Sequence, residues 1–297
     1  MKQKIIIAGG TGFIGQYLMT RFREEGYEVL LISRNSSAIT WSATDKIQAA
    51  LEGAEVLINL AGRSVDCRYT EANKQEILNS RVQTTKQLQA IIEQCHTPPK
   101  LWINSSTATI YRHAEDRPMD EDQGEIGTGF SVNVAKAWEQ AFFERATPLT
   151  RKVALRMAIV LGKGGGVMPP YTRLVRYGLG GVQGSGKQVF SWIHIEDVYR
   201  IIRFIMEHAA LEGIYNTATP HPVLNKQFMQ LLRRRIRPLI YFASPEWLLQ
   251  LGAKLIGTET ELVLKSRWVV PQKLQAAGFT FRYPTVSEAL DGILTED

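Results

Sequence analysis

Three glycines spaced three residues apart follow an apolar run near the start of the chain, in the stretch IIIAGGTGFIG. A strand that enters such a turn and continues as a helix is typical of a dinucleotide site, although such a turn can also bind nothing. Gly9 permits the tight turn, Gly12 lets backbone approach a pyrophosphate, and Gly15 lets the helix pack closely on the strand. N–H groups at the helix N-terminus then attract the phosphates. The cofactor-binding residues expected here are Gly9, Thr11, Gly12, Phe13, Ile14 and Gly15.

The residues after the second expected strand bear on the choice between NAD and NADP. NAD sites usually have an acidic residue about 20 residues further on, which binds the ribose 2′-hydroxyl. This chain has Ser33, Arg34 and Asn35 there. The planar guanidinium of Arg34 suits a 2′-phosphate, whereas the alternative is a solvated surface arginine. We expect NADP rather than NAD, bound in part by Ser33 and Arg34.

Apolar runs and helical periodicities alternate along the first half of the chain, which predicts a parallel sheet with helices on both faces. Strands are expected at residues 4–8, 28–33, 56–60, 101–105 and 153–160, and helices at 13–25, 71–94 and 131–145. The expected fold class is α/β, a Rossmann-type doubly wound parallel sheet with a smaller, α-rich C-terminal substrate lobe.

After residue 161 the regular alternation ends, and two glycine-rich stretches follow, GKGGGVMPP and YGLGGVQGSG. Further elements are expected as helices at 171–176, 195–208 and 226–235 and a strand at 213–217. This pattern predicts an NAD(P)-binding domain at 1–160, to which 191–218 return, and a smaller substrate lobe at 161–190 and 219–297.

The composition is that of a globular protein, with 44% hydrophobic and 22% charged residues in 297. Apolar runs fall short of the roughly 20 residues that span a bilayer, and EWLLQLGAKLIG at 246–257 fits an amphipathic helix. We expect no signal peptide, no membrane partner and a cytoplasmic location. The two cysteines, Cys67 and Cys95, form neither a disulfide framework nor a metal cluster, so no metal site is expected.

The formal net charge of +6 raises the question of a nucleic-acid partner. The only dense basic run, RRRIR at 233–237, ends the helix expected at 226–235, where cations interact favourably with the helix dipole. We interpret it as a solvated helix end and expect no nucleic-acid partner. The excess positive charge can instead attract an anionic cofactor or substrate.

Several segments resemble the extended short-chain dehydrogenase/reductase superfamily: the glycine turn, NLAG at 59–62, SSTATIY at 105–111 and WIHIEDV at 192–198. The resemblance implies that NLAG lines the adenine and ribose side, which adds Leu60, Ala61 and Gly62 to the cofactor site. SSTATIY would carry the catalytic hydroxyl residue, Thr107. WIHIEDV would border the substrate lobe.

A narrower resemblance covers essentially the whole chain. The segments at 68–88, 161–170, 178–198 and 269–290 are similar to epimerase family proteins of the YfhF/YfcH type. Those proteins resemble nucleotide-sugar epimerases and carry their own C-terminal segment. The resemblance implies a small polar substrate, such as a nucleotide sugar, and a possible homodimer through helices like those at 71–94 and 131–145.

The chain departs from the superfamily at the residues that would transfer protons. The superfamily uses a Tyr four residues before a Lys, and here Lys136 fits the Lys while Val132 occupies the Tyr position. Valine cannot carry a proton, whereas Lys136 can still hold the cofactor ribose. Arg81 stands where the superfamily often has Asn, and we include Arg81 and Lys136 among the cofactor-binding residues.

Other groups are candidates for the chemistry or the pocket. The catalytic set that we expect is Thr107, Lys136 and Tyr111, although Tyr111 can also pack or bind a ribose. The residues expected on the substrate side are Arg63, Trp192 and His194. His194 can titrate near neutral pH or bond Asp197 at a helix start, and Trp192 can line a pocket or pack in the core. Arg156, within an apolar strand, holds either a buried carboxylate or the substrate.

Three functions compete. The first is an NADP-dependent epimerase, dehydratase or reductase, which the cofactor residues and the lobe favour. The second is a non-catalytic NADP-binding redox sensor or assembly protein, which Val132 favours. The third is a nucleic-acid binder, which rests on charge alone and has the least support.

Overall fold

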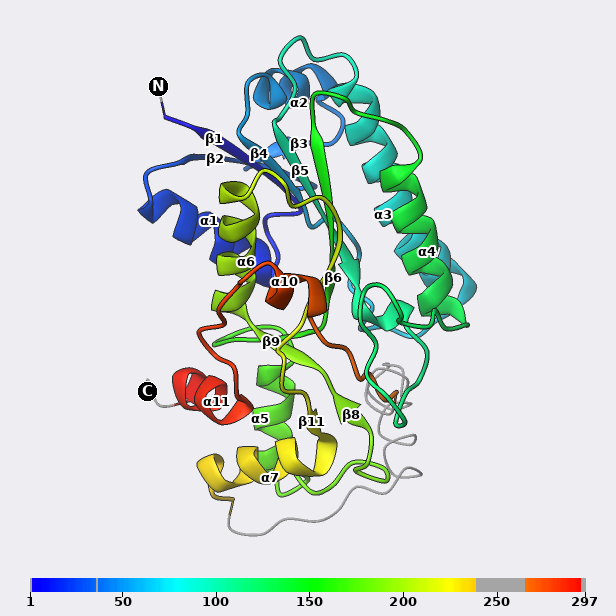
Figure 1. Cartoon of the computed structure of the whole chain (residues 1–297), viewed down its shortest axis with the longest axis vertical. Helices are drawn as coiled ribbons and strands as arrows, with labels where there is room; N and C mark the ends of the chain where they lie inside the picture. Colours follow the sequence, from blue (N-terminus) through cyan, green and yellow to red (C-terminus); the bar gives the residue numbers. More distant parts are fainter. Residues whose placement is uncertain (1, 36, 239–264, 295–297) are drawn as a thin grey trace.

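A seven-stranded parallel sheet forms the centre of the protein (Figure 1). The computed structural model describes residues 2–35, 37–238 and 265–294. The strand order is β10-β6-β5-β4-β1-β2-β3, which is the doubly wound Rossmann order, so the expected fold class is confirmed. The strands are β1 (Lys4–Ala8), β2 (Glu28–Ser33), β3 (Ile39–Thr40), β4 (Val56–Asn59), β5 (Leu101–Thr107), β6 (Arg151–Met157) and β10 (Gly213–Thr217).

Helices cover both faces of this sheet because its strands are apolar on both sides. Along β1, Ile5 and Ile7 pack toward one face, and Ile6 and Ala8 toward the other, as the two-residue period of a strand requires. The first face is covered by α1 (Phe13–Glu24) and α6 (Ile195–Glu207), and the second by α2 (Thr44–Leu51), α3 (Glu71–Ile92) and α4 (Phe130–Phe143).

A smaller lobe with its own apolar core lies below the carboxyl edge of the sheet in Figure 1. Its elements are α5 (Met168–Arg176), β8 (Val189–Phe190), β11 (Val223–Leu224), α7 (Asn225–Ile236) and α11 (Val286–Leu294). The remaining elements are the short helix η1 (Ala108–Ile110), α10 (Gln272–Ala276), and the parallel pair β7 (Ile159–Leu161) and β9 (Trp192–His194).

The structure differs from the sequence expectations in a few elements. The strand expected at 153–160 is two strands, β6 and β7, and the short β3 and α2 were not predicted. α5 begins three residues early because prolines suit the first turn of a helix. Part of the segment assigned to the lobe returns to the sheet, where Leu274 and Phe279 join the α6 side of the core. The helix expected at 246–257 lies outside the described residues.

A buried ion pair joins β6 to α4. The Arg156 guanidinium contacts the Glu139 carboxylate twice, Nε to Oε1 and Nη2 to Oε2, each at 2.8 Å. Ser106 of β5 donates to the same carboxylate at 2.6 Å. Exposed fractions of 7% for Arg156 and 8% for Glu139 leave little water to solvate either charge. Burial alone would lower the pKa of Arg156, but the Glu139 hydrogen bonds and charge raise it overall.

We expect Arg156→Met to lower the free energy of unfolding by about 3–5 kcal/mol, because it leaves the Glu139 carboxylate buried and unpaired. The double variant Arg156→Met/Glu139→Met should cost less than the single one. Lys100→Met is the control, since Lys100 is exposed and pairs with Glu55 at the surface, and it should cost at most about 1 kcal/mol. Denaturant titration measures the free energy of unfolding of all three variants. An equal loss in Arg156→Met and in the control variant would contradict the prediction.

Candidate functional site

The carboxyl ends of four neighbouring strands bring most of the expected cofactor residues to one edge of the sheet. β5, β4, β1 and β2 are adjacent in that order, and all are parallel. Thr107, the loop 60–62, the glycine turn and Ser33–Arg34 lie at these four ends. Ligands of doubly wound sheets bind outside the carboxyl edge, where the strand order switches. This edge is therefore the candidate site.

Close backbone approaches explain two of the three glycines in the turn. Gly9 has φ +77°, and a Cβ there would lie 2.7 Å from the backbone nitrogen of Ala61. A Cβ on Gly15 would lie 2.5 Å from the Gly10 Cα. Gly12 differs, because the nearest atom to an added Cβ is the Gly9 oxygen at 3.8 Å. Gly12 is also the N-cap of α1 and supplies no side-chain acceptor, so the space beside the first N–H groups of α1 suits an anion.

Asn59, the last residue of β4, holds the loop 60–62 in place. Its side-chain oxygen accepts from the Ala61 N–H at 3.0 Å. Its Nδ2 donates to Asn104 at 2.7 Å and to Thr85 at 3.2 Å. Asn59, Asn104 and Thr85 are all fully buried. Sequence analysis missed this network. A usable signal was the asparagine within each of the apolar strands β4 and β5, because a buried amide needs a hydrogen-bond partner.

Arg81 of α3 supports the same loop from the side. Its Nη2 donates to the Arg63 carbonyl at 3.1 Å, and its Nη1 to the Ile77 carbonyl at 2.8 Å. The guanidinium lies 5.1 Å from the Trp138 ring, and a Cβ on Gly62 would approach its Cζ to 3.0 Å. Burial lowers the pKa of Arg81 to about 10, which leaves it charged at neutral pH. A direct contact of Arg81 with the cofactor stays a prediction.

Ser33 and Arg34 end β2 in different environments. The Ser33 hydroxyl is buried and accepts from the Asn35 N–H at 2.9 Å, so it shapes the turn. Arg34 is exposed, and its guanidinium makes no hydrogen bond or ion pair with the residues that the structure describes. Its charge is therefore available to a ligand.

The residues at the expected catalytic position are Thr107, Val132 and Lys136. Thr107 is half-exposed, and its hydroxyl accepts from the Thr109 N–H at 3.1 Å. Val132 is fully buried in a cluster with Ala108, so a larger ring there would have to displace its neighbours. Lys136, one helical turn later, is exposed. A proton-transfer role for Thr107 and a ribose contact for Lys136 stay predictions.

Tyr111 belongs to the buried network and not to an open pocket. Its ring is 1% exposed, and its hydroxyl accepts from Arg156 and donates to Asn216, both at 2.9 Å. Desolvation raises the pKa of Tyr111, although Arg156 opposes the shift. A phenol that stays protonated at neutral pH cannot act as a general base. Tyr111 is thus packed inside the network, and a catalytic role for it stays a prediction. Arg156 holds a buried carboxylate, and its partner, Glu139, was not identified from sequence.

Trp192 and His194 also have structural surroundings. Trp192 is fully buried in the core of the lobe, which is its packing alternative. His194 is the N-cap of α6, and its Nδ1 accepts from the Glu196 N–H at 3.1 Å. Its ring lies 3.9 Å from that of Tyr283. Desolvation, followed by the charge of Arg282, lowers the pKa of His194 to about 4. Both side chains thus have structural partners, and their assignment to the substrate side stays a prediction.

Asp197 anchors the C-terminal part of the chain. Its buried carboxylate accepts from the backbone N–H groups of Arg282 and Tyr283 at 2.7 and 3.0 Å. The expected hydrogen bond between His194 and Asp197 is thus replaced by two bonds from the C-terminal segment. WIHIEDV forms a helix start that holds this segment against the sheet.

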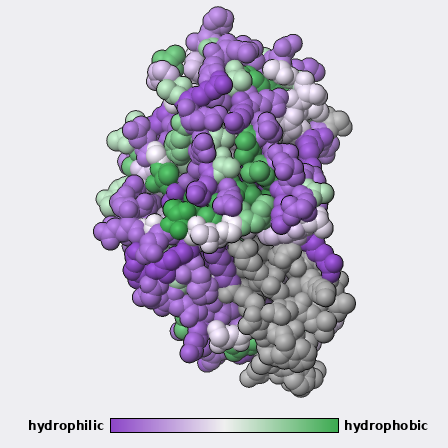
Figure 2. Space-filling view, turned by 90° about the vertical axis from the view of Figure 1, so that its right-hand side faces the viewer, coloured by the Kyte–Doolittle hydropathy of each residue, from purple (hydrophilic) through white to green (hydrophobic). Residues whose placement is uncertain are grey.

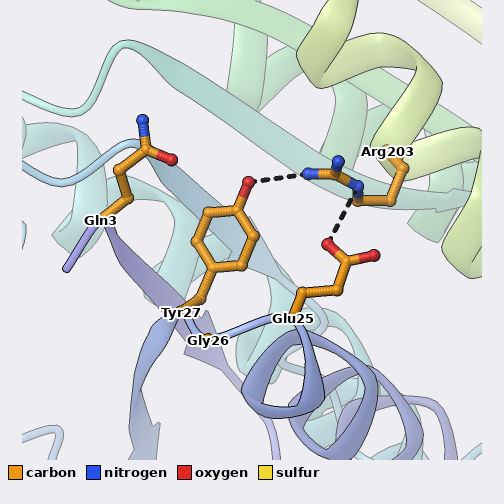
Figure 3. A pocket seen from close by; sticks show the side chains of 5 residues that line it. All are labelled: Gln3, Glu25, Gly26, Tyr27 and Arg203. Carbon is orange, nitrogen blue, oxygen red and sulfur yellow. Dashed lines mark hydrogen bonds and ion pairs between the residues drawn. The ribbon is translucent and has the colours of Figure 1, made fainter.

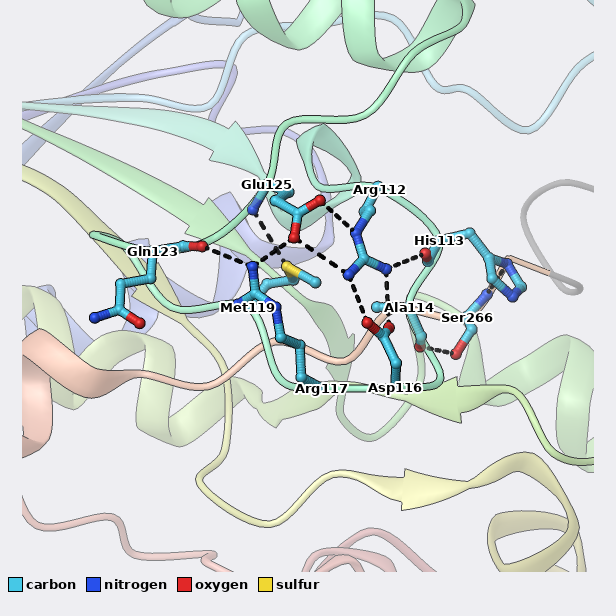
Figure 4. A network of polar contacts seen from close by, with 9 residues as sticks. All are labelled: Arg112, His113, Ala114, Asp116, Arg117, Met119, Gln123, Glu125 and Ser266. Carbon is cyan, nitrogen blue, oxygen red and sulfur yellow. Dashed lines mark hydrogen bonds and ion pairs between the residues drawn. The ribbon is translucent and has the colours of Figure 1, made fainter.

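Residues 265–270, here called the C-terminal strap, cross the loop that follows β5. Ser266 donates to the Ala114 carbonyl at 2.6 Å, and the Met119 N–H donates to Trp268 at 2.7 Å. Figure 4 shows the loop closed on itself by Arg112, which bonds Asp116 and Glu125. The same strap pairs with β8 through Arg267 and Phe190. It therefore ties the lobe to the sheet beside the candidate site.

Three of the arginines that the sequence analysis singled out bond other residues of the protein. Arg63 pairs with Glu76 and donates to Asn73 at 2.9 Å, so α3 holds part of its guanidinium. In the run RRRIR, Arg233 donates to the Gly180 carbonyl at 2.6 Å, and Arg235 to Asp291 at 2.7 Å. These contacts join the helix end to other segments of the lobe, so it is only partly solvated, in contrast to the sequence interpretation.

Other surfaces lie apart from the candidate site. A groove of about 410 Å³ opens at the amino ends of β1 and β2, where Arg203 bonds Tyr27 and Glu25 (Figure 3). Figure 2 shows apolar residues gathered on the side of the molecule where α3 and α4 lie. A homodimer through these helices stays a prediction. Within the described ranges, every helix is too short or too polar to cross a membrane.

Comparisons with known proteins agree with this architecture. Residues 5–218 match the NAD dependent epimerase/dehydratase family, and residues 244–293 match a domain of unknown function, DUF1731. The chain is 32% identical to the epimerase family protein YfhF of Bacillus subtilis, over 98% of both chains. It is 32% identical to the human epimerase family protein SDR39U1, over 98% of this chain and 99% of that one.

Solved structures are similar over nearly the whole chain. The crystal structure of human SDR39U1 (isoform 2) with NADPH has a TM-score of 0.90 and 30% identity, covering 99% of this chain and 100% of that one. The nucleoside-diphosphate sugar epimerase from Corynebacterium glutamicum has a TM-score of 0.79 and 26% identity, covering 99% of this chain and 58% of that one.

The lowered pKa of His194 predicts a loss of stability in acid. The unfolded chain binds a proton to this residue below pH about 6.5, whereas the folded chain does so only near pH 4. Between pH 7.5 and 4.5 the wild type should therefore lose about 2.5 kcal/mol more than His194→Asn, whose side chain can still cap α6. Denaturant titrations at both pH values measure this difference, and parallel losses in the two proteins would contradict it.

Proposed function

The chain belongs to the NAD dependent epimerase/dehydratase family, and from that premise we propose that it binds NADP and acts on a small polar substrate as an epimerase, dehydratase or reductase. The space beside Gly12 at the start of α1 carries this proposal, because protein atoms do not fill it. The NADPH in the human relative's structure supports the same assignment. A nucleotide sugar is the substrate class that we favour.

The residues at the carboxyl edge fit a dinucleotide. The glycine turn and the first N–H groups of α1 would hold the pyrophosphate. The loop 60–62, fixed by Asn59 and Arg81, would border the adenine side. Arg34 would meet a 2′-phosphate, since its charge has no partner among the described residues and no carboxylate follows β2. We therefore favour NADP over NAD.

The protein's own groups have limited means to move a proton. A nicotinamide held by the residues of this edge would supply or accept the hydride. Thr107 presents a hydroxyl there that can orient a substrate oxygen, and Lys136 offers a charged amine on α4. Tyr111 keeps its proton because desolvation raises its pKa. The substrate hydroxyl would therefore exchange its proton with water or with a substrate group, with Thr107 as the orienting residue.

A non-catalytic NADP-binding protein, such as a redox sensor or assembly protein, is the second candidate. Val132 favours it, because a fully buried valine occupies the position of the proton-transferring tyrosine. The two candidates share the cofactor site and differ in turnover. Analysis of candidate sugar nucleotides after incubation with the protein and NADP⁺ or NADPH separates them. An epimerase or dehydratase changes the sugar and regenerates its cofactor, a reductase also consumes NADPH, and a sensor leaves the sugar unchanged.

Gly12→Ala tests the pyrophosphate position. Its added Cβ meets no protein atom closer than 3.8 Å, so the free energy of unfolding should change by less than about 1 kcal/mol. NADPH affinity should fall at least about tenfold, because the methyl group occupies the space that phosphate needs. Gly15→Ala is the contrast and should destabilise the fold itself. Fluorescence titration with NADPH decides, and unchanged affinity in Gly12→Ala would refute the site.

Arg34→Ala tests the choice of cofactor. Loss of a charge-assisted contact with a 2′-phosphate should weaken NADPH binding about 10- to 100-fold and leave NADH binding within about twofold. Arg234→Ala removes one positive charge from an exposed position on α7 in the lobe and serves as the control. An equal loss for both nucleotides would show that Arg34 does not select the cofactor.

A further inference from the structure

A single aromatic ring joins the dinucleotide turn to the loop that enters the lobe. Phe13 is the first residue of α1, directly after Gly12. Residues 162–166, here called the GKGGG loop, connect β7 toward α5. A Cβ on Gly165 would lie 2.1 Å from the Phe13 ring, and one on Gly162 would lie 2.7 Å from it. A Cβ on Gly166 would approach the ring to 3.2 Å.

These distances mean that the glycines lie directly against the ring. A side chain at Gly162 or Gly165 would overlap it, so both positions require glycine as long as Phe13 occupies this place. The GKGGG loop has four glycines in five residues, and glycine loses more conformational freedom on ordering than any other residue. Glycines have no side chains with which to hold a loop. Glycines of this loop contact Phe13 and, at Gly162, Ile195, so packing against Phe13 contributes to its order.

The backbone of Phe13 lies at the other end of this contact. Its N–H is among the first donors of α1, and Gly12 leaves the space beside them open. A phosphate bound there would fix the first turn of α1 and, with it, the Cα and Cβ from which the ring projects. Reduced motion of the ring would in turn restrict the GKGGG loop and the start of α5.

We propose that Phe13 is a positioning residue that couples occupancy of the dinucleotide turn to ordering of the GKGGG loop. The lobe would thereby gain its ordered entrance after the cofactor has bound, which implies that cofactor binds before substrate. This inference rests on the proposed function, since it requires a dinucleotide at the turn. It assigns the Phe13 ring a role separate from that of its N–H group.

Hydrogen exchange of the full chain, with and without saturating NADPH, tests the coupling. In the wild type we expect NADPH to slow exchange at least about tenfold both in the glycine turn and in residues 160–168. In Phe13→Ala, at NADPH concentrations that saturate the variant, the glycine turn should stay protected. The NADPH-dependent slowing of exchange in residues 160–168 should fall below about twofold. Phe143→Ala, which removes a ring at the end of α4, should behave as the wild type.

Gly165→Ala approaches the same contact from the loop and keeps Phe13 intact. Its methyl group must displace the ring, so it should also lose the NADPH-dependent protection of residues 160–168. Phe13→Leu is the milder replacement if Phe13→Ala does not fold, and it should show partial protection. Protection of the turn without protection of 160–168 in the wild type would overturn the coupling, as would full loop protection in Phe13→Ala. If NADPH protects neither segment in the wild type, the proposed function itself fails.

Discussion

The pairing of Arg156 with Glu139 constrains the part of the molecule next to the candidate site. Two charges removed from water are tolerated only when each satisfies the other, and here the pair joins β6 to α4 with Ser106 of β5 as a third member. Through Tyr111 and Asn216 the same network reaches β10. The strand end that carries Thr107 is thus fixed by polar contacts beneath it.

Backbone approach is the second constraint on the carboxyl edge. At Gly9 the turn meets the loop after β4, and at Gly15 the helix α1 meets the turn itself. The glycines of the GKGGG loop approach the side chain of Phe13 in the same close way. Glycine is needed in these places because a Cβ would overlap neighbouring atoms, whereas at Gly12 the space is open. This contrast separates Gly9 and Gly15, which the fold requires, from Gly12, whose missing side chain would leave room for the proposed ligand.

The residues that would bind the cofactor are distinct in this chain from those that would transfer protons. The glycine turn, Asn59, Arg81 and Arg34 lie together at the edge where we propose that the cofactor binds. Val132, by contrast, contributes only packing volume where the family resemblance implies a tyrosine. The reaction that we propose at this edge would therefore depend on how substrate and water are placed beside Thr107, and less on an acid or base of the protein.

The sequence by itself determined the alternation of strands and helices, the glycine turn and the absence of an acid after β2, because periodicity and local turn chemistry are properties of short segments. It could not determine which distant residues meet. Glu139 as the partner of Arg156, the hold of Asp197 on residues 282–283, and the strap across the loop after β5 all join segments far apart in the chain. Tertiary structure also decided that Tyr111 and Trp192 are buried, since the solvent exposure and the partners of a side chain depend on segments that lie far from it in the chain.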